Sequence, residues 1–247
     1  MDKYVISEQL SMNYDKAYLI SLERSPGRRK NFYRYARKAD LNVEWFPALY
    51  GLDVDTEDYQ KRGYLSEDFQ LRLAGSLGTL LSHVHVWEKV AADPQCDVGL
   101  VFEDDAVFGR RFRKDLAAID EANIPDDWDM LWLGWHKLDC DPVNEVVGSP
   151  RKTEGKSVNS GHFAYMIKSS SVEKMKALLL PYDNRRSKDV LLRKHFNAFR
   201  AYFLLEKIVK TPRIGFDSVR KNINDPKRID GRPLKKLVQR IRKLFLE

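Results

Sequence analysis

The sequence predicts an α/β fold with a largely parallel sheet flanked by helices. Short apolar runs that favour strands alternate with longer segments whose apolar residues recur at three- and four-residue steps. The chain has 247 residues, 43% of them hydrophobic, which is enough to bury a sizeable core. In such sheets ligands bind beyond the carboxyl ends of the strands, so polar residues that follow a strand are the first candidates for a functional site.

The first half of the chain supplies three predicted strands and two main helices. The strands are 16–22, 43–51 and 98–102. The helices are 25–39, which opens with the entry signal Ser25-Pro26, and 75–93, which repeats Leu and Val at helical steps. The polar residues 52–74 between them predict a loop with a short helix.

The second half continues the alternation and ends in a basic tail. A helix near 110–122, strands at 128–135 and 161–168, and a helix capped by a serine of "SSSVEKM" follow in order. Residues 137–160 lack apolar periodicity, and an active-site lid and a flexible loop fit them equally well. "PLKKLVQRIRKLFLE" predicts a basic amphipathic helix, which suits either an anionic membrane surface or packing on the body with its basic face in solvent. We expect one domain over 1–225 and a tail over 226–247.

Charge and cysteine content restrict the partners and the compartment. The net charge of +7 favours anionic partners, but it is concentrated in the tail and no aromatic-basic recognition motif accompanies it, which argues against nucleic acid. Two cysteines, Cys96 and Cys140, are too few for a disulfide framework and lack zinc-ligand spacing. Without an apolar leader or a membrane-length apolar run, a cytoplasmic location is expected.

Three consecutive carboxylates, Glu103, Asp104 and Asp105, come directly after the apolar run 98–102. Strand alternation would place Glu103 and Asp105 on one side and Asp104 on the other. Two carboxylates on one side suit a divalent ion that keeps positions open for substrate phosphates. The stretch has no Lys or Arg, so we expect a ligand to supply the positive charge. Two other D-x-D sequences do not directly follow an unbroken apolar strand; they are 53–55 and 139–141.

Basic and imidazole side chains provide further candidates. Arg24, Arg28 and Arg29 follow the first strand at a helix start, where guanidinium groups suit a pyrophosphate, although an exposed basic helix face is an equal alternative. His83 and His85 lie on different faces of the helix 75–93, so we do not expect them to share a metal; a single His here is more often a hydrogen-bonded packing residue.

Six ordered stretches of the chain resemble glycosyltransferase family 25, the lipooligosaccharide and procollagen galactosyltransferase family. They are YLISLERSPGRRKNF, FPALYGLD, GSLGTLLSHVHVWEKV, GLVFEDDAVF, WDMLWLG and GHFAYMIKSSSVEKM, and they span about residues 16–180. SKDVLL and TPRIGF stand where the family has its later segments. The family's helix usually reads like GCxxSH; this chain has GTLLSH, a departure that we expect to affect packing rather than chemistry.

The resemblance implies a GT-A-type, Rossmann-like α/β fold, a UDP-sugar donor (most often UDP-galactose), Mn²⁺ or Mg²⁺, and transfer with inversion to a glycan or glycolipid acceptor such as lipooligosaccharide. It assigns Glu103 and Asp105 to the metal and the donor, with Asp104 in the same motif. It also places several residues beside the donor nucleotide, namely Ser21, Leu22, Arg28, Ser82 and His83.

Inversion in a single displacement needs a general base outside the metal cluster. Asp189 in SKDVLL is the first candidate, although an ordinary acid in the first turn of a helix is an equally good description. His162, as a donor or acceptor contact, and Asp129 are the second and third candidates. The preferred function is a metal-dependent sugar transferase at the cytoplasmic membrane face. The alternative is a non-catalytic member that binds a sugar or a partner protein, against which the intact EDD triplet argues.

Overall fold

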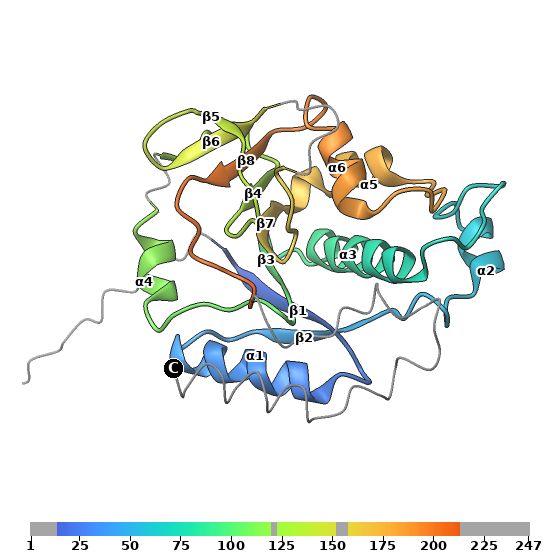
Figure 1. Ribbon diagram of the computed structural model, residues 1–247, viewed down its shortest axis with the longest axis horizontal. Coiled ribbons are helices and arrows are strands. Elements are labelled where there is room, and N and C mark those ends of the chain that lie inside the picture. The colour runs from blue at the N-terminus through green and yellow to red at the C-terminus, as the bar shows by residue number, and fades with distance from the viewer. Residues whose placement is uncertain (1–13, 120–122, 152–157, 213–247) are drawn as a thin grey trace, which may run out of the picture.

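The computed structural model describes residues 14–119, 123–151 and 158–212, and eight strands of these residues form one mixed sheet (Figure 1). Across the sheet the order is β2-β1-β3-β7-β4-β8-β6-β5. The strands are β1 Lys16–Leu22, β2 Glu44–Ala48, β3 Val98–Glu103, β4 Met130–Trp132, β5 Cys140–Pro142, β6 Val147–Pro150, β7 Ala164–Lys168 and β8 Ala201–Leu204. The α/β class that the sequence predicts is confirmed.

Parallel pairing is confined to two groups of strands. β1 pairs in parallel with β2 and β3, and β4 pairs in parallel with β8. Between the groups β7 runs antiparallel to both β3 and β4, and β6 runs antiparallel to β5 and β8. The parallel share is therefore smaller than the alternation of strands and helices predicts, because the connection from β4 to β7 contains the β5–β6 hairpin instead of a crossover helix.

The helices follow the predicted order. They are α1 Pro26–Lys38, α2 Thr56–Lys61, α3 Ala74–Ala92, α4 Phe112–Ala117, α5 Val172–Leu179 and α6 Lys188–Lys194. α4 is shorter than the predicted 110–122. Ser171 does precede α5, but its hydroxyl makes no capping bond and donates to Asp129 Oδ1 at 2.6 Å, so the predicted serine cap is wrong in its chemistry.

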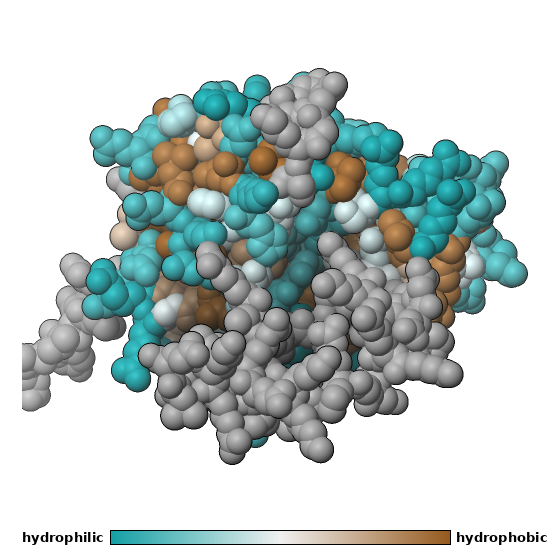
Figure 2. Space-filling view, in the orientation of Figure 1, coloured by the Kyte–Doolittle hydropathy of each residue, from teal (hydrophilic) through white to brown (hydrophobic). Residues whose placement is uncertain are grey.

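The sheet separates two hydrophobic cores because successive side chains of a strand face opposite sides. In β1, Leu19 packs with side chains of α1 and α4, whereas Tyr18 and Ile20 pack with side chains of α3, α5 and α6. Figure 1 accordingly shows α1 and α3 on opposite sides of β1. On the face seen in Figure 2, hydrophilic side chains surround scattered apolar ones.

The described part of the connection 137–160 has regular structure that its lack of apolar periodicity does not predict. Its described part contains the antiparallel pair β5 and β6, and buried Asn159 holds its base by accepting from Asp139 N and donating to Asp139 O, both at 2.7 Å. Strands of three and four residues are too short to show an alternating pattern in the sequence, which is why they were not predicted.

Two expectations about membranes concern different parts of the chain. Within the described ranges, no helix combines the length and the apolar composition that crossing a bilayer requires. The predicted amphipathic tail, 226–247, lies outside the described residues, as does the predicted boundary at 225.

Candidate functional site

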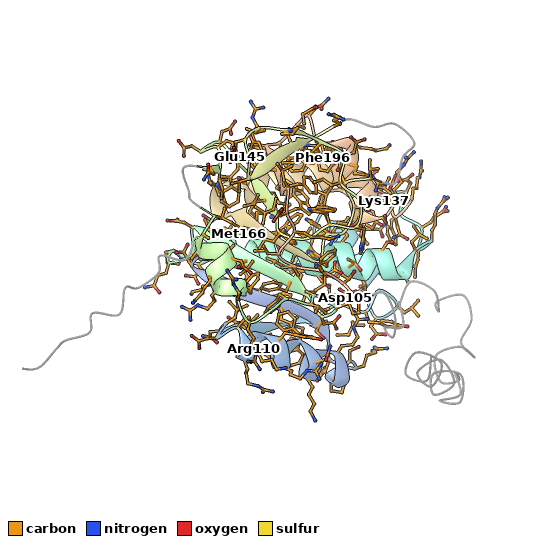
Figure 3. All side chains as sticks on the ribbon, turned by 60° about the vertical axis from the view of Figure 1, so that its left-hand side comes forward. Asp105, Arg110, Lys137, Glu145, Met166 and Phe196 are labelled. Atoms are coloured by element: carbon orange, nitrogen blue, oxygen red, sulfur yellow. The ribbon has the colours of Figure 1, made fainter. Side chains whose placement is uncertain are left out.

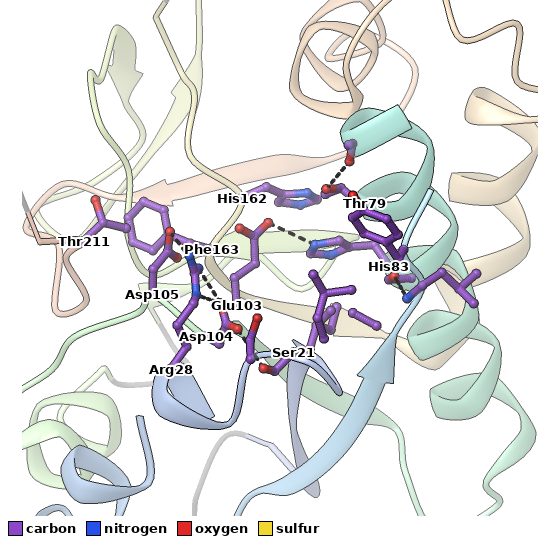
Figure 4. A pocket seen from close by; sticks show the side chains of 18 of the residues that line it. Ser21, Arg28, Thr79, His83, Glu103, Asp104, Asp105, His162, Phe163 and Thr211 are labelled. Carbon is purple, nitrogen blue, oxygen red and sulfur yellow. Dashed lines mark hydrogen bonds and ion pairs between the residues drawn. The ribbon is translucent and has the colours of Figure 1, made fainter. Parts of the chain in front are cut away.

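A cavity of about 300 Å³ opens where β1 and β3 end, between α1 and α3 (Figure 4). Figure 3 shows Asp105 in this region, between the layers of these two helices. All of the predicted donor-binding, metal-binding and catalytic residues line the cavity: Ser21, Leu22, Arg28, Ser82, His83, Glu103, Asp104, Asp105, His162 and Asp189. The fold thus brings together segments from five separate parts of the sequence, although it does not by itself test their roles.

The acidic triplet is arranged differently from the alternation that a strand predicts. β3 ends at Glu103, and Asp104 and Asp105 lie in the turn that follows, so all three carboxylates line the cavity. Asp104 accepts hydrogen bonds from Ser21 Oγ and Arg28 Nε, each at 2.7 Å. The expectation that Asp104 faces away from the other two is therefore wrong, because the turn ends the period-2 pattern.

The chain itself supplies positive charge to the triplet. Arg28 forms an ion pair with Asp104, and its Nη2 lies 3.6 Å from Asp105 Oδ2. On the other side, Nζ of fully buried Lys188 lies 3.3 Å from Glu103 Oε1. The expectation that only a ligand provides charge is wrong, because both cations come from segments more than 70 residues away in the sequence.

Asp105 is the least compensated member of the triplet. Burial, followed by the nearby charge of Glu103, raises the pKa of Asp105 to about 7, although Arg28 acts in the opposite direction. Its Oδ1 is buried and, among the described residues, has no hydrogen-bond partner. A carboxylate with an open oxygen beside a second carboxylate is an arrangement that a cation stabilises.

The donor set fits a divalent ion only if the substrate completes the coordination. No cluster of three or more His, Cys, Asp and Glu side chains in the described part of the chain is arranged to hold a metal. Mg²⁺ is usually held by one or two carboxylates and completes its shell with waters and substrate phosphates. Glu103 and the open Oδ1 of Asp105 fit that pattern.

His83 connects the triplet to the core of the protein. Its ring is fully buried; Nε2 lies 3.1 Å from Glu103 Oε1 and Nδ1 lies 2.7 Å from the Tyr165 hydroxyl. Burial, followed by the charge of Lys188, lowers the pKa of His83 to about 4, so the ring is neutral near pH 7. As predicted, His85 lies on another face, where it contacts Tyr59 and Glu88.

His162 lines the cavity and has one ring nitrogen without a partner among the described residues. The ring is buried and stacks against Trp132, and its Nε2 lies 3.2 Å from Met130 Sδ. A thioether sulfur is an acceptor, so Nε2 carries the proton and Nδ1 is left as an acceptor. Nδ1 has no partner within the described residues. Burial holds the pKa of His162 well below its ordinary value, which keeps the ring neutral.

Asp189 and Ser82 reach the cavity from two helices. Asp189 lies in the first turn of α6, and its buried Oδ1 has no partner in the described ranges. The hydroxyl of Ser82 donates to Gly78 O at 2.6 Å and accepts from Leu49 N at 2.8 Å. Ser82 therefore fixes the loop after β2 against α3, and Leu22 contributes the end of β1.

Three other candidate residues lie away from the cavity lining. Arg24 stacks on Tyr50 and pairs with Asp53, and Arg29 bonds the backbone at the end of β1. Asp129, the third base candidate, is buried under α5, where it accepts from Ser171, Lys174 and the Arg200 N–H. It therefore stabilises the fold and is not available as a base.

The D-x-D sequences 53–55 and 139–141 also have structural roles. The Asp55 carboxylate accepts from Asp58 N and caps α2. Asp139 and Asp141 both pair with Arg151 beside the β5–β6 hairpin.

Sequence reasoning missed three site residues: Lys188, Tyr165 and Trp87. Lys188 stands four residues before buried Leu192, and this i, i+4 spacing on one helix face is the signal that it turns inward. Tyr165 and Trp87 have the sequence pattern of ordinary core residues. Nothing in a sequence shows that the Tyr165 hydroxyl meets His83, or that the Trp87 indole N–H meets that hydroxyl.

A family model described as glycosyltransferase family 25 (LPS biosynthesis protein) matches residues 14–211. The chain is 33% identical over 146 residues to a glycosyltransferase 25 family member of Aedes aegypti, covering 56% of this chain and 24% of that protein. It is 27% identical over 147 residues to procollagen galactosyltransferase 2 of Homo sapiens, covering 55% and 23%. A probable inactive glycosyltransferase 25 family member 3 of Rattus norvegicus matches at 28% over 148 residues, covering 56% and 26%.

Among solved structures, the glycosyltransferase GlyE of Streptococcus pneumoniae aligns with a TM-score of 0.42 at 12% identity, covering 76% of this chain and 45% of that one. A Drosophila β-1,4-galactosyltransferase 7 variant in complex with manganese, UDP-Gal and xylobiose aligns with a TM-score of 0.38 at 9% identity, covering 91% and 79%.

The chain spans about a quarter of the length of the curated relatives that it matches. The matched residues nevertheless contain the whole sheet and the whole lining of the cavity described above. The resemblance that the six ordered stretches predict is thereby confirmed, and the chain belongs to glycosyltransferase family 25.

Proposed function

We propose that the chain is a metal-dependent, inverting glycosyltransferase. It moves a hexose, for which galactose is the first candidate, from a UDP-sugar to a hydroxyl of a glycan acceptor. One observation carries the proposal. Three residues that line the same cavity each have a buried polar atom without a partner among the described residues, namely Asp105 Oδ1, His162 Nδ1 and Asp189 Oδ1. Each unpaired polar atom costs about 1–3 kcal/mol, so their convergence indicates a site built for a ligand.

The three open atoms have one chemistry in common, since all are acceptors. Sugar hydroxyls are donors, and a divalent ion binds carboxylate oxygens, so a sugar nucleotide with its cation supplies what the cavity lacks. Arg28, which is paired with Asp104 and also lines the cavity, adds positive charge on the side where the diphosphate is proposed to lie. The proposed donor is a UDP-galactose because several relatives carry the name galactosyltransferase.

In the proposed reaction Glu103 and Asp105 would hold the divalent ion, and the ion would supply positive charge beside the leaving nucleoside diphosphate. Lys188 and Arg28 hold the carboxylates of the triplet in place through their ion pairs. Asp189, whose open Oδ1 faces no donor of the described chain, takes the proton of the acceptor hydroxyl as it attacks the anomeric carbon. His162 Nδ1 accepts a hydrogen bond from a sugar hydroxyl.

The acceptor and the location are proposed from the tail and the family description. The family model is described as an LPS biosynthesis protein, which favours a glycolipid such as lipooligosaccharide. A basic amphipathic segment at 226–247 would hold the enzyme at the anionic cytoplasmic face of the membrane, beside such an acceptor.

The test is a panel of UDP-sugars with Mn²⁺, in which released UDP is measured. We expect one donor to be turned over, the Asp105→Asn variant to lose activity at least about a hundredfold, and Asp189→Asn to lose transfer while it still binds the donor. Asp141→Asn changes another D-x-D acid, outside the cavity, and serves as the control. Full activity of Asp105→Asn, or of the wild type in excess EDTA, would contradict the metal assignment.

A non-catalytic sugar- or partner-binding role is the second candidate. It is favoured by one observation, that a relative of similar identity carries the description probable inactive. Calorimetry with UDP and Mn²⁺ separates the two functions. Nucleotide binding supports the transferase, whereas its absence in a folded protein supports the binding module.

A further inference from the structure

A buried line of hydrogen bonds runs from the core to the Glu103 carboxylate. Trp87 Nε1 lies 2.8 Å from the Tyr165 hydroxyl, the same hydroxyl lies 2.7 Å from His83 Nδ1, and His83 Nε2 lies 3.1 Å from Glu103 Oε1. Trp87, Tyr165 and His83 are all fully buried. The cavity begins at His83 and Glu103, so Trp87 and Tyr165 lie behind the lining.

The direction of each bond in this line follows from the donors available. An indole N–H only donates, so the Tyr165 oxygen accepts from Trp87. Burial keeps the pKa of Tyr165 well above its ordinary value, so the hydroxyl retains its own proton. That proton has one acceptor within reach in the described chain, His83 Nδ1. Nδ1 is therefore bare, and the ring proton of His83 sits on Nε2.

The other protonation patterns of the ring leave a group unsatisfied. With the proton on Nδ1, the Tyr165 oxygen would face two donors while its own proton had no acceptor. The unprotonated Nε2 would then also lie 3.1 Å from the Glu103 carboxylate, and two hydrogen-bond acceptors would repel each other at that distance. A doubly protonated ring would strand the phenolic proton in the same way. The Nε2–H form alone satisfies Trp87, Tyr165, His83 and Glu103 together.

We infer that Tyr165, held by Trp87, is a positioning residue: it fixes His83 in the Nε2–H tautomer, and His83 in turn orients the Glu103 carboxylate. The consequence for the reaction rests on the proposed function, in which Glu103 helps to hold the divalent ion. Groups that hydrogen-bond a metal-binding side chain from behind change metal affinity by about 10–100-fold when removed.

The first arm of the test compares two buried tyrosines of the full-length chain. Tyr165→Phe removes the hydroxyl that bonds His83, and Tyr18→Phe removes a buried hydroxyl that has no partner in the described residues. Tyr165 acts on Glu103 through His83, so we expect Tyr165→Phe to weaken Mn²⁺ binding in the presence of UDP by up to about 10-fold, the lower end of that range. Tyr18→Phe should leave it unchanged. Equal effects of the two substitutions would overturn the inference.

The second arm separates positioning from a general loss of packing. In His83→Gln the side-chain amide can still donate to Glu103, but it no longer needs Tyr165 to orient it. We expect His83→Gln to keep most of the Mn²⁺ affinity that His83→Leu loses, and Tyr165→Phe to have little further effect in the Gln background. If Tyr165→Phe weakens binding equally in both backgrounds, its role is structural and the inference fails.

The third arm needs neither metal nor activity. Nitrogen chemical shifts of the His83 ring in the metal-free wild type should report a protonated Nε2 and a bare Nδ1. The carboxyl carbon signal of Glu103 should move in Tyr165→Phe and not in Tyr18→Phe. A protonated Nδ1 or an unmoved Glu103 signal would overturn the inference. If the wild type binds no Mn²⁺–UDP, the proposed function fails, and these spectra still decide whether Tyr165 positions Glu103.

Discussion

Glu103, Asp104 and Asp105 are adjacent in the sequence, but the fold gives each carboxylate different partners. Asp104 is satisfied by Ser21 and Arg28. Glu103 meets a neutral imidazole and a buried ammonium group. Asp105 keeps an open oxygen. The three acids therefore differ in role: Asp104 joins β1 and α1 to the end of β3, and Glu103 and Asp105 are the two that we propose as ligands of a divalent ion.

The raised pKa of Asp105 predicts a pH-dependent stability. Because the folded pKa of about 7 exceeds the ordinary value of 3.8, the folded state binds this proton more tightly than the unfolded state. The stability gained is complete below the unfolded pKa and is lost as the pH rises to about 7. Asp105→Asn removes this dependence. Without divalent ions, the melting temperature of Asp105→Asn minus that of the wild type should therefore increase as the pH is raised from 4 to 8.

Thermal denaturation across that range checks the Asp105 prediction. Asp141→Asn, at an exposed carboxylate paired with Arg151, should follow the wild type. A constant offset between Asp105→Asn and the wild type at every pH would contradict the assignment of the raised pKa.

Asp129 predicts a stability effect separate from the site. Burial on its own raises the pKa of Asp129, but hydrogen bonds from Lys174, Ser171 and Arg200 N–H outweigh it and lower the pKa. In Asp129→Asn an NH₂ group replaces one carboxylate oxygen, so a hydrogen-bond donor faces groups that themselves donate. We expect a loss of about 2–4 kcal/mol in the free energy of unfolding, measured in urea, with UDP affinity of the folded protein retained.

Asp127→Asn is the matched control for Asp129→Asn, because exposed Asp127 also pairs with Arg200, through the guanidinium group at 2.9 Å. An exposed pair of this kind contributes about 0–1 kcal/mol. If both variants lose the same free energy of unfolding, the buried hydrogen bonds of Asp129 do not contribute more than an exposed ion pair, and the prediction is wrong.

At the scale of elements, two glycines let the loop after β2 lie against α3. A Cβ on Gly78 would stand 2.4 Å from Leu49 O, and a Cβ on Gly51 would stand 1.8 Å from Ala74 O. Both clashes are with backbone, so an alanine must displace the loop that lines the cavity. We expect Gly78→Ala to lower the free energy of unfolding by about 1–3 kcal/mol and to weaken UDP binding.

Gly27→Ala is the control for Gly78→Ala, because both glycines lie in helices and nothing stands within 4 Å of a Cβ on Gly27. Alanine there should be neutral or stabilise by up to about 1 kcal/mol. Urea denaturation and UDP titration of both variants test the prediction. Normal UDP affinity in Gly78→Ala would mean that the loop position does not matter for the donor.

The elements that could be predicted are those with a complete pattern in the sequence. α3 shows Leu and Val at helical spacing, and β1 and β3 are unbroken apolar runs. β5 and β6 are too short for a pattern, and the antiparallel direction of β7 depends on the hairpin before it. Strand direction is a property of connections, which local sequence does not encode.

At the scale of the molecule, the site too has a part that local sequence predicts and a part that depends on tertiary packing. Ordered motifs predict which residues gather at the ends of β1 and β3, because parallel strands end at one edge. They do not predict which side chains pair there. Lys188 reaches Glu103 across 85 positions, and Tyr165 reaches His83 across 82. Pairing over such separations is decided by tertiary packing.

The charge of the whole chain leads to the last prediction, which concerns the tail. Residues 226–247 carry eight Lys and Arg against two Asp and Glu, so they hold +6 of the net +7. Each basic residue near an anionic bilayer contributes about 1 kcal/mol. Replacing Lys235, Lys236, Arg242 and Lys243 with Gln should weaken binding to anionic vesicles by about a hundredfold or more, measured by co-sedimentation at physiological salt.

The control removes the same charge from the exposed face of α1, by Gln at Lys30, Arg34, Arg37 and Lys38. If net charge alone drives vesicle binding, both variants lose it equally. If the tail is the contact, only the tail variant loses vesicle binding. The predicted apolar face of the tail can be buried in the membrane interface. The apolar face of α1 cannot, because Phe32 and Ala36 already pack on the sheet. A tail variant that binds vesicles like the wild type would instead support the alternative in which the segment packs on the body.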